Sequence, residues 1–290
     1  MINRLGAIRP KPGDLSPLRI DEALVRKMLV GFLRDEAAKA GFGKGIVNVS
    51  GGIDSAVVAF LAAEAYGAEH VIALLLPYRT SDPSSLSDAR EVVRALGIRS
   101  EEHDITAQID AYFGAEGGVS KVDRVRAGNK MARERMSILY DRSFVLGAMP
   151  LGTSNKTELL LGYGTLHGDM ASAINPVGDL YKTQLRELAA LLAVPERIRA
   201  KVPSADLWVG QTDEAELGAS YAELDLILYH MVDRRLSPAE LIEAGFDARL
   251  VENVRERVRR SHYKRVPPIV AKVSLRTVGH DFLYPRDWER

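Results

Sequence analysis

Short apolar runs alternate with longer stretches of mixed polarity through the first half of the chain. The runs at 45–49 and 71–76 are continuous, which is typical of parallel strands buried on both faces. Weaker strand patterns occupy 99–104 and 144–151. Between them lie segments with apolar residues at helical spacing. This order predicts an α/β fold with a doubly wound, mostly parallel sheet flanked by helices.

The helical segments carry recognisable ends. Apolar residues recur every three or four positions from Ile20 to Leu33, and Gly41 follows where a helix cap is expected. A second helix is expected at 86–96, closed by Gly97, and a third at 122–140. Each of these helices would cover one face of the predicted sheet.

Three segments lack such periodicity. Glycines make 114–121 a candidate mobile loop, and 204–216 has the length and composition of a lid. From about residue 266 the prolines predict an irregular tail. We expect one domain over 1–290, because no linker or repeat divides the chain.

Composition narrows the classes of function. The 290 residues are 46% hydrophobic and 27% charged, and 39 basic residues offset 39 acidic ones. No global charge favours nucleic acid or a membrane as partner. No signal peptide or membrane span is evident, so we expect a cytoplasmic protein. The absence of cysteine excludes thiol nucleophiles and thiolate metal sites.

The string Ser50-Gly51-Gly52-Ile53-Asp54-Ser55 lies between the first predicted strand and a helix. Glycines let the backbone close around phosphate, and the helix N-terminus offers unpaired N–H groups and a positive dipole end. Asp54 would be repelled by phosphates unless a cation lay between them, which favours Mg²⁺. The alternative is an ordinary strand-to-helix turn in which Asp54 is a helix N-terminal charge.

A second polar segment, residues 152–158, follows the strand pattern that ends near Leu151. Thr153 can cap the following helix, and Glu158 lies about one turn into it. Glu158 could complete a capping arrangement or be the second carboxylate on the Mg²⁺ ion of Asp54. We favour the metal role, since magnesium commonly takes two carboxylates beside phosphates. Arg79, after the second strand, could stack on adenine or pair with phosphate, or be a solvated loop arginine.

Several segments in order resemble the signature segments of NAD synthetase, a family of N-type ATP pyrophosphatases with a PP-loop. They are 50–55, 76–79, 128–133, 152–158, 178–182 and 211–218, and the resemblance runs from about Ile20 to Pro268. It implies an adenine nucleotide alpha hydrolase-like, Rossmann-like fold. It also implies a homodimer that binds deamido-NAD at the subunit interface.

The resemblance implies a reaction: ATP adenylates the nicotinate carboxylate of deamido-NAD, pyrophosphate leaves, and ammonia attacks to release NAD and AMP. No protein nucleophile is expected, so catalysis would rest on positioning and charge neutralisation. The resemblance implies that ATP binds to Ser50, Gly51, Gly52, Ile53, Asp54, Ser55, Arg79, Thr153, Lys182 and Ser204. It implies that Asp54 and Glu158 bind Mg²⁺, and that deamido-NAD binds to Asn129, Arg133, His262 and Lys264. It also implies a mobile loop on the pyrophosphate side at Gln211, Thr212 and Asp213.

Two positions depart from the short members of the family. Leu166 stands where many have a substrate-binding lysine, and Ala173 where they have an aspartate. The segment 160–169 looks more like the larger, glutamine-using members, whose glutaminase nucleophile is a cysteine. Because this chain has neither the length for a glutaminase domain nor a cysteine, free ammonia is the expected nitrogen source, the alternative being ammonia delivered by a separate chain.

Two other functions stay open at this stage. One is a different PP-loop enzyme, such as a GMP synthetase-like amidotransferase module or a tRNA-modifying thiolase, although the absence of cysteine argues against a thiolase. The other is a non-catalytic module that senses ATP, which would not need Glu158, Lys182 and the 211–218 segment together.

Overall fold

The computed structural model describes residues 10–208 and 210–279. Four strands form one parallel sheet in the order β3-β2-β1-β4. They are β1 (Gly45–Asn48), β2 (Val71–Leu75), β3 (Arg99–Glu102) and β4 (Met149–Pro150). The predicted parallel α/β fold is therefore confirmed.

The register brings the carboxyl ends of the strands to one edge of the sheet. Gly45 of β1 pairs with Val71 of β2 on one side and with Met149 of β4 on the other, and Ile72 pairs with Arg99 of β3. All of β2 is buried, as the continuous apolar pattern predicts. Every loop that leaves a strand end thus emerges on the same side.

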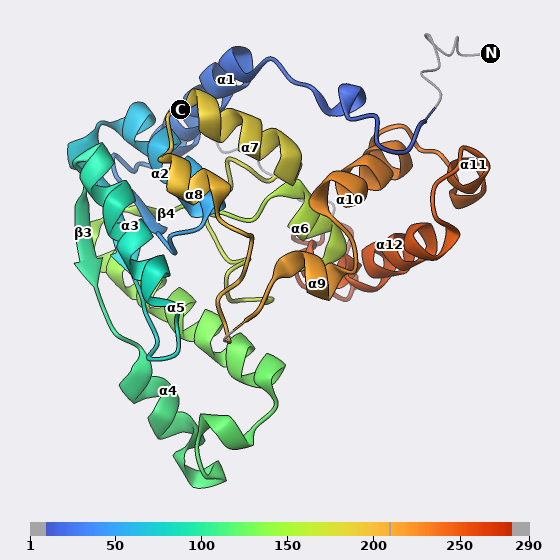
Figure 1. The fold of residues 1–290 in the computed structure, drawn as a ribbon. Helices are drawn as coiled ribbons and strands as arrows, with labels where there is room; N and C mark the ends of the chain where they lie inside the picture. The colour runs from blue at the N-terminus through green and yellow to red at the C-terminus, as the bar shows by residue number, and fades with distance from the viewer. Residues whose placement is uncertain (1–9, 209, 280–290) are drawn as a thin grey trace.

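Helices cover both faces of the sheet (Figure 1). One face packs against α1 (Glu22–Lys39), α2 (Ile53–Tyr66), α3 (Pro83–Leu96) and α7 (Lys182–Leu191), with α8 (Glu196–Ala200) beside α7. The other face packs against α4 (Thr106–Phe113) and α5 (Arg124–Leu146). This doubly wound arrangement leaves the carboxyl edge open for a ligand.

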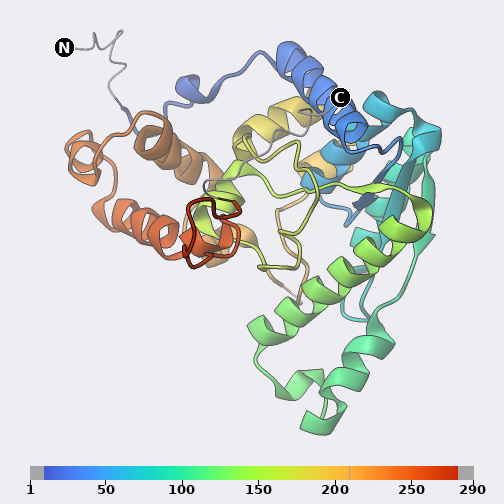
Figure 2. The ribbon, with the colours of Figure 1, turned by 180° about the vertical axis from the view of Figure 1, so that it is seen from behind.

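A second group of helices lies beside the sheet (Figure 1), and its buried apolar side chains form a separate cluster. It is built by α6 (Lys156–Leu161), α9 (Asp213–Leu217), α10 (Tyr221–Leu228), α11 (Pro238–Glu243) and α12 (Ala248–Arg260). The π-helical turn Tyr229–Asp233 continues α10. After α12 the chain folds back beside α6, where Arg265 donates to the Leu160 carbonyl (Figure 2).

Short 3₁₀ turns complete the described elements: Ser16–Leu18, Ala68–His70, Gly114–Glu116, Val119–Lys121 and His262–Lys264. Two of them lie in the segment where a mobile loop is expected. From 265 to 279 no helix is present, as predicted for the first part of the tail, and 280–290 lie outside the described residues. No helix among the described residues is long and apolar enough to cross a membrane.

The predicted strand at 144–151 is wrong in its first half. Helix α5 continues to Leu146, Gly147 caps it with a positive φ of 59°, and Ala148 N donates to Ser143 O at 3.0 Å. The apolar run misled the prediction because Phe144 is on the outer surface of the helix, 90% exposed. Only Met149 and Pro150 form β4.

Candidate active site

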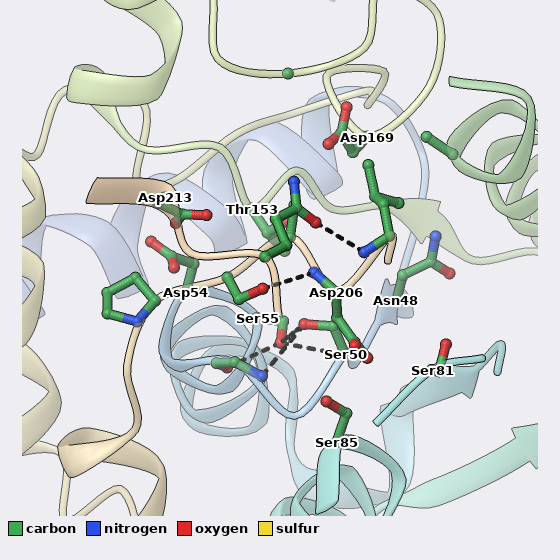
Figure 3. A pocket seen from close by; sticks show the side chains of 18 of the residues that line it. Asn48, Ser50, Asp54, Ser55, Ser81, Ser85, Thr153, Asp169, Asp206 and Asp213 are labelled. Carbon is green, nitrogen blue, oxygen red and sulfur yellow. Dashed lines mark hydrogen bonds between the residues drawn. The ribbon is translucent and has the colours of Figure 1, made fainter. Parts of the chain in front are cut away.

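A cleft of about 1040 Å³ opens at the carboxyl edge of the sheet. Its walls come from the β1–α2 loop, the start of α3, one side of α5, and the segments 153–169 and 201–213. Figure 3 shows side chains from these separate parts of the chain converging on one space. This is the place where ligands bind in open α/β sheets.

The loop 50–55 is braced by its own hydroxyl groups. Ser50 N donates to Ser55 Oγ at 3.2 Å, Gly52 N donates to Ser50 Oγ at 3.2 Å, and Ser55 Oγ donates to Gly52 O at 3.0 Å. The first turn of α2 begins at Ile53, so its N-terminus opens into the cleft. These contacts fix the shape of the turn, and a helix N-terminus of this kind suits an anion.

Gly51 is the position in this loop that requires glycine. Its φ is +82°, and a Cβ there would lie 2.1 Å from the backbone oxygen of Ser85 and 3.1 Å from Cβ of Asp88. The loop and α3 therefore touch through backbone, with no room for a side chain. Whether the same glycine also lets the backbone close around phosphate stays a prediction.

Two carboxylates from distant parts of the chain meet one lysine. Lys182 Nζ donates to Asp54 Oδ2 and lies 3.4 Å from Glu158 Oε1. Asn155 connects the same groups, because its Nδ2 donates to Asp54 Oδ1 at 2.8 Å while its backbone N donates to Glu158 Oε2 at 3.3 Å. The structure thus brings together Asp54, Glu158 and Lys182.

Burial and charge shift the titration of this cluster. Burial raises the pKa of Glu158 to about 8, and the Asp54 carboxylate adds to the rise. Burial alone would lower the pKa of Lys182, but Asp54 and Glu158 outweigh it and hold the lysine pKa above its ordinary value. A cation bound between Asp54 and Glu158 would offset the burial and the charge of Asp54 that raise the pKa of Glu158, so the two carboxyl groups suit a cation that arrives with phosphates.

The predicted cap of α6 was assigned to the wrong residue. Asn155, not Thr153, is the N-cap: its side chain accepts from Glu158 N at 3.0 Å, and Glu158 reaches back to the Asn155 backbone. Glu158 therefore completes a capping box and also faces Lys182. The two interpretations offered for Glu158 from the sequence are compatible in one geometry.

The residues expected to bind a dinucleotide lie on one side of α5. Asn129 Oδ1 accepts from Thr165 Oγ1 at 2.7 Å, and Arg133 Nε donates to Leu166 O at 3.2 Å. Asn129 lines the cleft, and Arg133 is exposed outside it. Their four-residue spacing places both side chains on one face of α5, where they contact Thr165 and Leu166.

Lys264 and His262 have different surroundings. Lys264 lines the cleft and donates to the carbonyl oxygens of Gly162 at 2.8 Å and Gly164 at 2.7 Å. Burial lowers the pKa of Lys264. His262 is exposed in the 3₁₀ turn and is not among the residues that line the described cleft.

The expected lid contributes a buried carboxylate. Asp213 accepts from Tyr163 OH at 3.0 Å and from Tyr221 OH at 2.9 Å, and the ring centre of Tyr221 lies 5.1 Å from Lys182 Nζ. Burial raises the pKa of Asp213. Of its neighbours, Gln211 and Thr212 also line the cleft.

The same segment is tied to α3. Asp206, in a left-handed conformation (φ 51°), accepts from the backbone N of Asp82 at 3.0 Å. Lys201 Nζ donates to Asp88 Oδ2 at 2.8 Å and to Ser85 Oγ at 3.1 Å. Ser204 lies between them in the cleft wall, where its Oγ accepts from Asp206 N. The segment 201–206 thus closes one side of the cleft.

Comparison with known proteins matches residues 25–268 to the family described as NAD synthase. A protein of Trichlorobacter lovleyi named NH(3)-dependent NAD(+) synthetase is 54% identical over 274 residues, covering 94% of this chain and 99% of that protein. The chain belongs to the NAD synthase family. It is accordingly a ligase of NAD biosynthesis in a nucleotide-binding PP-loop family, and we call the loop at 50–55 its PP-loop because of the sequence resemblance.

Two solved structures have the same fold. An NMN synthetase from Francisella tularensis has a TM-score of 0.77 and 32% identity, covering 87% of this chain and 99% of that chain. An NH3-dependent NAD synthetase from Campylobacter jejuni, in complex with nitrate, has a TM-score of 0.74 and 30% identity, covering 88% of this chain and all of that chain. The NAD synthase fold therefore spans nearly the whole described chain.

Arg79 does not face the cleft in this member of the NAD synthase family. Its guanidinium lies 2.6 Å from Asp110 Oδ2 and over the ring of Tyr78, and its side chain is about half exposed. Thr80 and Ser81, the next residues, do line the cleft. An ATP contact from Arg79 would require its side chain to leave Asp110.

Sequence reasoning missed several polar residues in or next to the cleft. Asn48 Oδ1 at the end of β1 is buried and has no hydrogen-bond partner among the described residues. Arg135 reaches the Leu76 carbonyl at 2.9 Å, and burial lowers its pKa. Asn155 could have been found from the Asn-x-x-Glu capping pattern. Nothing in the local sequence indicates that Tyr163 and Tyr221 hold Asp213.

Proposed function

We propose that this chain amidates deamido-NAD to NAD, consuming ATP and ammonia and releasing AMP and pyrophosphate. The observation that carries the proposal is the meeting of Asp54, Glu158 and Lys182 beside the PP-loop. Three groups from three separate strand or helix ends converge there, which an ordinary strand-to-helix turn does not require.

The first step needs charge neutralisation rather than a protein nucleophile. A nicotinate carboxylate oxygen attacks the α-phosphorus of ATP, the bond to the β-phosphate oxygen breaks, and pyrophosphate leaves. The backbone N–H groups of the PP-loop and the Lys182 ammonium would stabilise negative charge on the phosphates. In the second step ammonia attacks the acyl adenylate, loses a proton, and AMP leaves.

A magnesium ion fits the donor set. Asp54 and Glu158 already share one cation, Lys182, and two carboxylates are what Mg²⁺ takes when phosphates and waters supply its other ligands. In the described part of the chain, no group of three or more His, Cys, Asp or Glu residues is placed to hold a metal ion. The ion would neutralise phosphate charge when bound; Asp54 and Glu158 would hold it.

Positioning falls to the walls of the cleft. Thr153, Ser204 and the PP-loop would hold ATP, and Asn129 and Lys264 would hold the dinucleotide. Arg79, Arg133 and His262 lie outside the described cleft, so their assigned roles require a rearrangement or a second subunit. Gln211, Thr212 and Asp213 would enclose the pyrophosphate.

A homodimer is part of this proposal. Helix α5 carries Arg133 and leaves Phe144 90% and Val145 58% exposed, so its outer surface offers apolar area to a second copy. Light scattering of the purified protein tests the dimer; a monomer at assay concentration would contradict it.

The experiment mixes purified protein with ATP, Mg²⁺, deamido-NAD and ammonium, and follows NAD and AMP. Equal amounts of both products are expected, and glutamine in place of ammonium should give almost none. If neither product forms, the proposal is wrong.

A second substrate has a specific observation behind it. The Francisella tularensis relative is an NMN synthetase, and Leu166 and Ala173 depart from residues that the resemblance assigns to substrate binding. The same assay with nicotinate mononucleotide therefore runs in parallel. We expect a higher kcat/KM for deamido-NAD than for nicotinate mononucleotide. A higher kcat/KM for the mononucleotide would identify it as the preferred substrate.

A further inference from the structure

A fully buried carboxylate lies behind the active site, outside every motif of the sequence analysis. Asp225 is on α10 and is 0% exposed, between the buried side chains of Leu224 and Leu226. Burial raises its pKa to about 6, and hydrogen bonds from Thr157 and Thr183 oppose the rise. A carboxylate in such surroundings is costly unless its hydrogen bonds are satisfied.

Its two oxygens join two helices. Asp225 Oδ1 accepts from Thr157 Oγ1 of α6 at 2.5 Å, and Asp225 Oδ2 accepts from the backbone N of Thr183 of α7 at 2.8 Å. The Thr157 hydroxyl in turn accepts from Lys182 N at 3.0 Å. Asp225 and Thr157 thus satisfy the first N–H groups of α7, where a negative charge is also favoured by the helix dipole.

The joined residues are the sequence neighbours of the active-site groups. Thr157 precedes Glu158, and Thr183 follows Lys182. These two neighbours line the cleft, where Lys182 Nζ lies 3.4 Å from Glu158 Oε1. A small displacement of either helix start would therefore separate these two side chains from each other and from Asp54.

We propose that Asp225 is a positioning residue, which fixes the starts of α6 and α7 so that Glu158 and Lys182 converge on Asp54. The kinetic test of this role rests on the proposed function, because it measures the rate at which NAD forms. Asp225 touches no substrate and acts through Thr157 and Thr183.

The test is Asp225→Asn, which keeps the shape but replaces one acceptor oxygen by an NH₂ group. We expect kcat to fall by roughly 10- to 100-fold, because displacements of about 1 Å can cost that much, while KM for the dinucleotide changes little. The Mg²⁺ concentration for half-maximal rate should rise. A role in folding alone would lower the melting temperature and leave kcat per folded molecule unchanged.

A matched control exists on the same side of α6 and α7. Asp233 accepts from Tyr181 OH at 2.9 Å and from Lys156 Nζ at 2.9 Å, so it also bridges the two helix starts, but nearer the surface. Asp233→Asn should keep kcat within about threefold, in line with partly exposed ion pairs. An equal loss of kcat in both variants would overturn the proposal.

A second pair of variants keeps the test decisive if Asp225→Asn does not fold. Thr157→Ser retains the bridging hydroxyl and should keep most activity, whereas Thr157→Val removes it and should reproduce the fall in kcat. Equal activities of the Ser and Val variants would contradict the proposal. Combining Thr157→Val with Asp225→Asn should add little, since both act through one joint.

A binding measurement separates this proposal from the proposed function. Calorimetric titration of ATP with and without Mg²⁺ requires no turnover. We expect Mg²⁺ to strengthen ATP binding to the unsubstituted protein more than to Asp225→Asn. If the unsubstituted protein makes no NAD, the proposed function fails while this titration still tests Asp225; an identical effect of Mg²⁺ on both proteins would refute the positioning role.

Discussion

The two halves of the active site are held in different ways. The PP-loop half depends on contacts within six residues, such as Ser50 N to Ser55 Oγ, and on the strand that precedes it. The half that carries Glu158 and Lys182 depends on contacts between residues far apart in sequence, such as Asp225 to Thr157. The PP-loop is thus braced largely by its own residues, apart from the backbone contact of Gly51 with Ser85, whereas the cluster of Asp54, Glu158 and Lys182 is held by distant residues.

Asp54 belongs to both halves, so its removal should have the largest effect. Asp54→Ala takes away a carboxylate for Mg²⁺ and leaves Lys182 and Asn155 without their shared acceptor. We expect kcat to fall by roughly 10²- to 10³-fold or more. Steady-state assays check the rate, and circular dichroism checks folding. Glu158→Ala should behave similarly, and near-normal rates in both variants would remove the metal assignment. The surface variant Glu102→Ala is the control.

Gly51 tests the PP-loop half at its contact with α3. An added Cβ would have a strained φ and would meet the Ser85 backbone, so Gly51→Ala should destabilise the fold by about 2–4 kcal/mol and raise KM for ATP. Gly52→Ala is the matched control, because Gly52 has a negative φ and its Cβ would meet only Ser50 Oγ at 3.3 Å. Urea unfolding measures both, and equal losses would show that the loop does not depend on this close approach.

A non-local ion pair outside the site should affect stability without affecting turnover. Glu101 on β3 accepts from Arg142 on α5 at 2.8 Å and also contacts Arg99 and His103. The hydrogen bond from Arg142 lowers the pKa of Glu101 to about 2. Because the folded-state pKa is depressed, the stabilisation is complete above the ordinary value and is lost as pH falls toward 2.

Glu101→Gln should therefore cost about 1–2 kcal/mol near neutral pH, and the difference from the unsubstituted protein should shrink in acid. Urea unfolding at a series of pH values gives the measurement. A difference that stays constant with pH would mean that packing, rather than charge, makes the contribution. The kcat of this variant should be unchanged.

Arg79 should give the smallest effect on stability. Its exposed pair with Asp110 contributes at most about 1 kcal/mol. Arg79→Ala compared with Asp110→Asn therefore isolates any role in ATP binding. If Arg79 contacts ATP as the resemblance implies, KM for ATP should rise in the arginine variant alone, and equal KM values would end that assignment.

The sequence was sufficient for the parts of the fold that depend on local pattern. The continuous apolar runs located β1 and β2, the Gly97 cap closed α3, and the glycines of the PP-loop indicated its close turn. Where several apolar residues lie on an outer helix surface, as at 144–146, the same reasoning gave a false strand. An apolar run alone does not show which neighbours will cover it.

The cluster of Asp54, Glu158 and Lys182 could not be predicted from the pattern of apolar and polar residues alone. The resemblance to NAD synthetase supplied Glu158 and Lys182, but not the groups that orient them. Asp225 is an acidic residue inside an otherwise apolar helix, and its partners lie 68 and 42 positions away. Asp213 likewise depends on tyrosines from two other elements. Such contacts are fixed by tertiary packing, which the sequence of one segment does not contain.

The place of β1 within the sheet has a consequence for hydrogen exchange. β1 is paired on both sides, and the hydrogen bond from Val49 N to Leu74 O extends this pairing to the residue before the PP-loop. The amides of β1 should therefore exchange only through the largest openings of the protein, and those of residues 201–208 through much smaller ones. When the molecule partly unfolds, β1 and the start of the PP-loop should therefore stay folded after the cleft wall at 201–206 has opened.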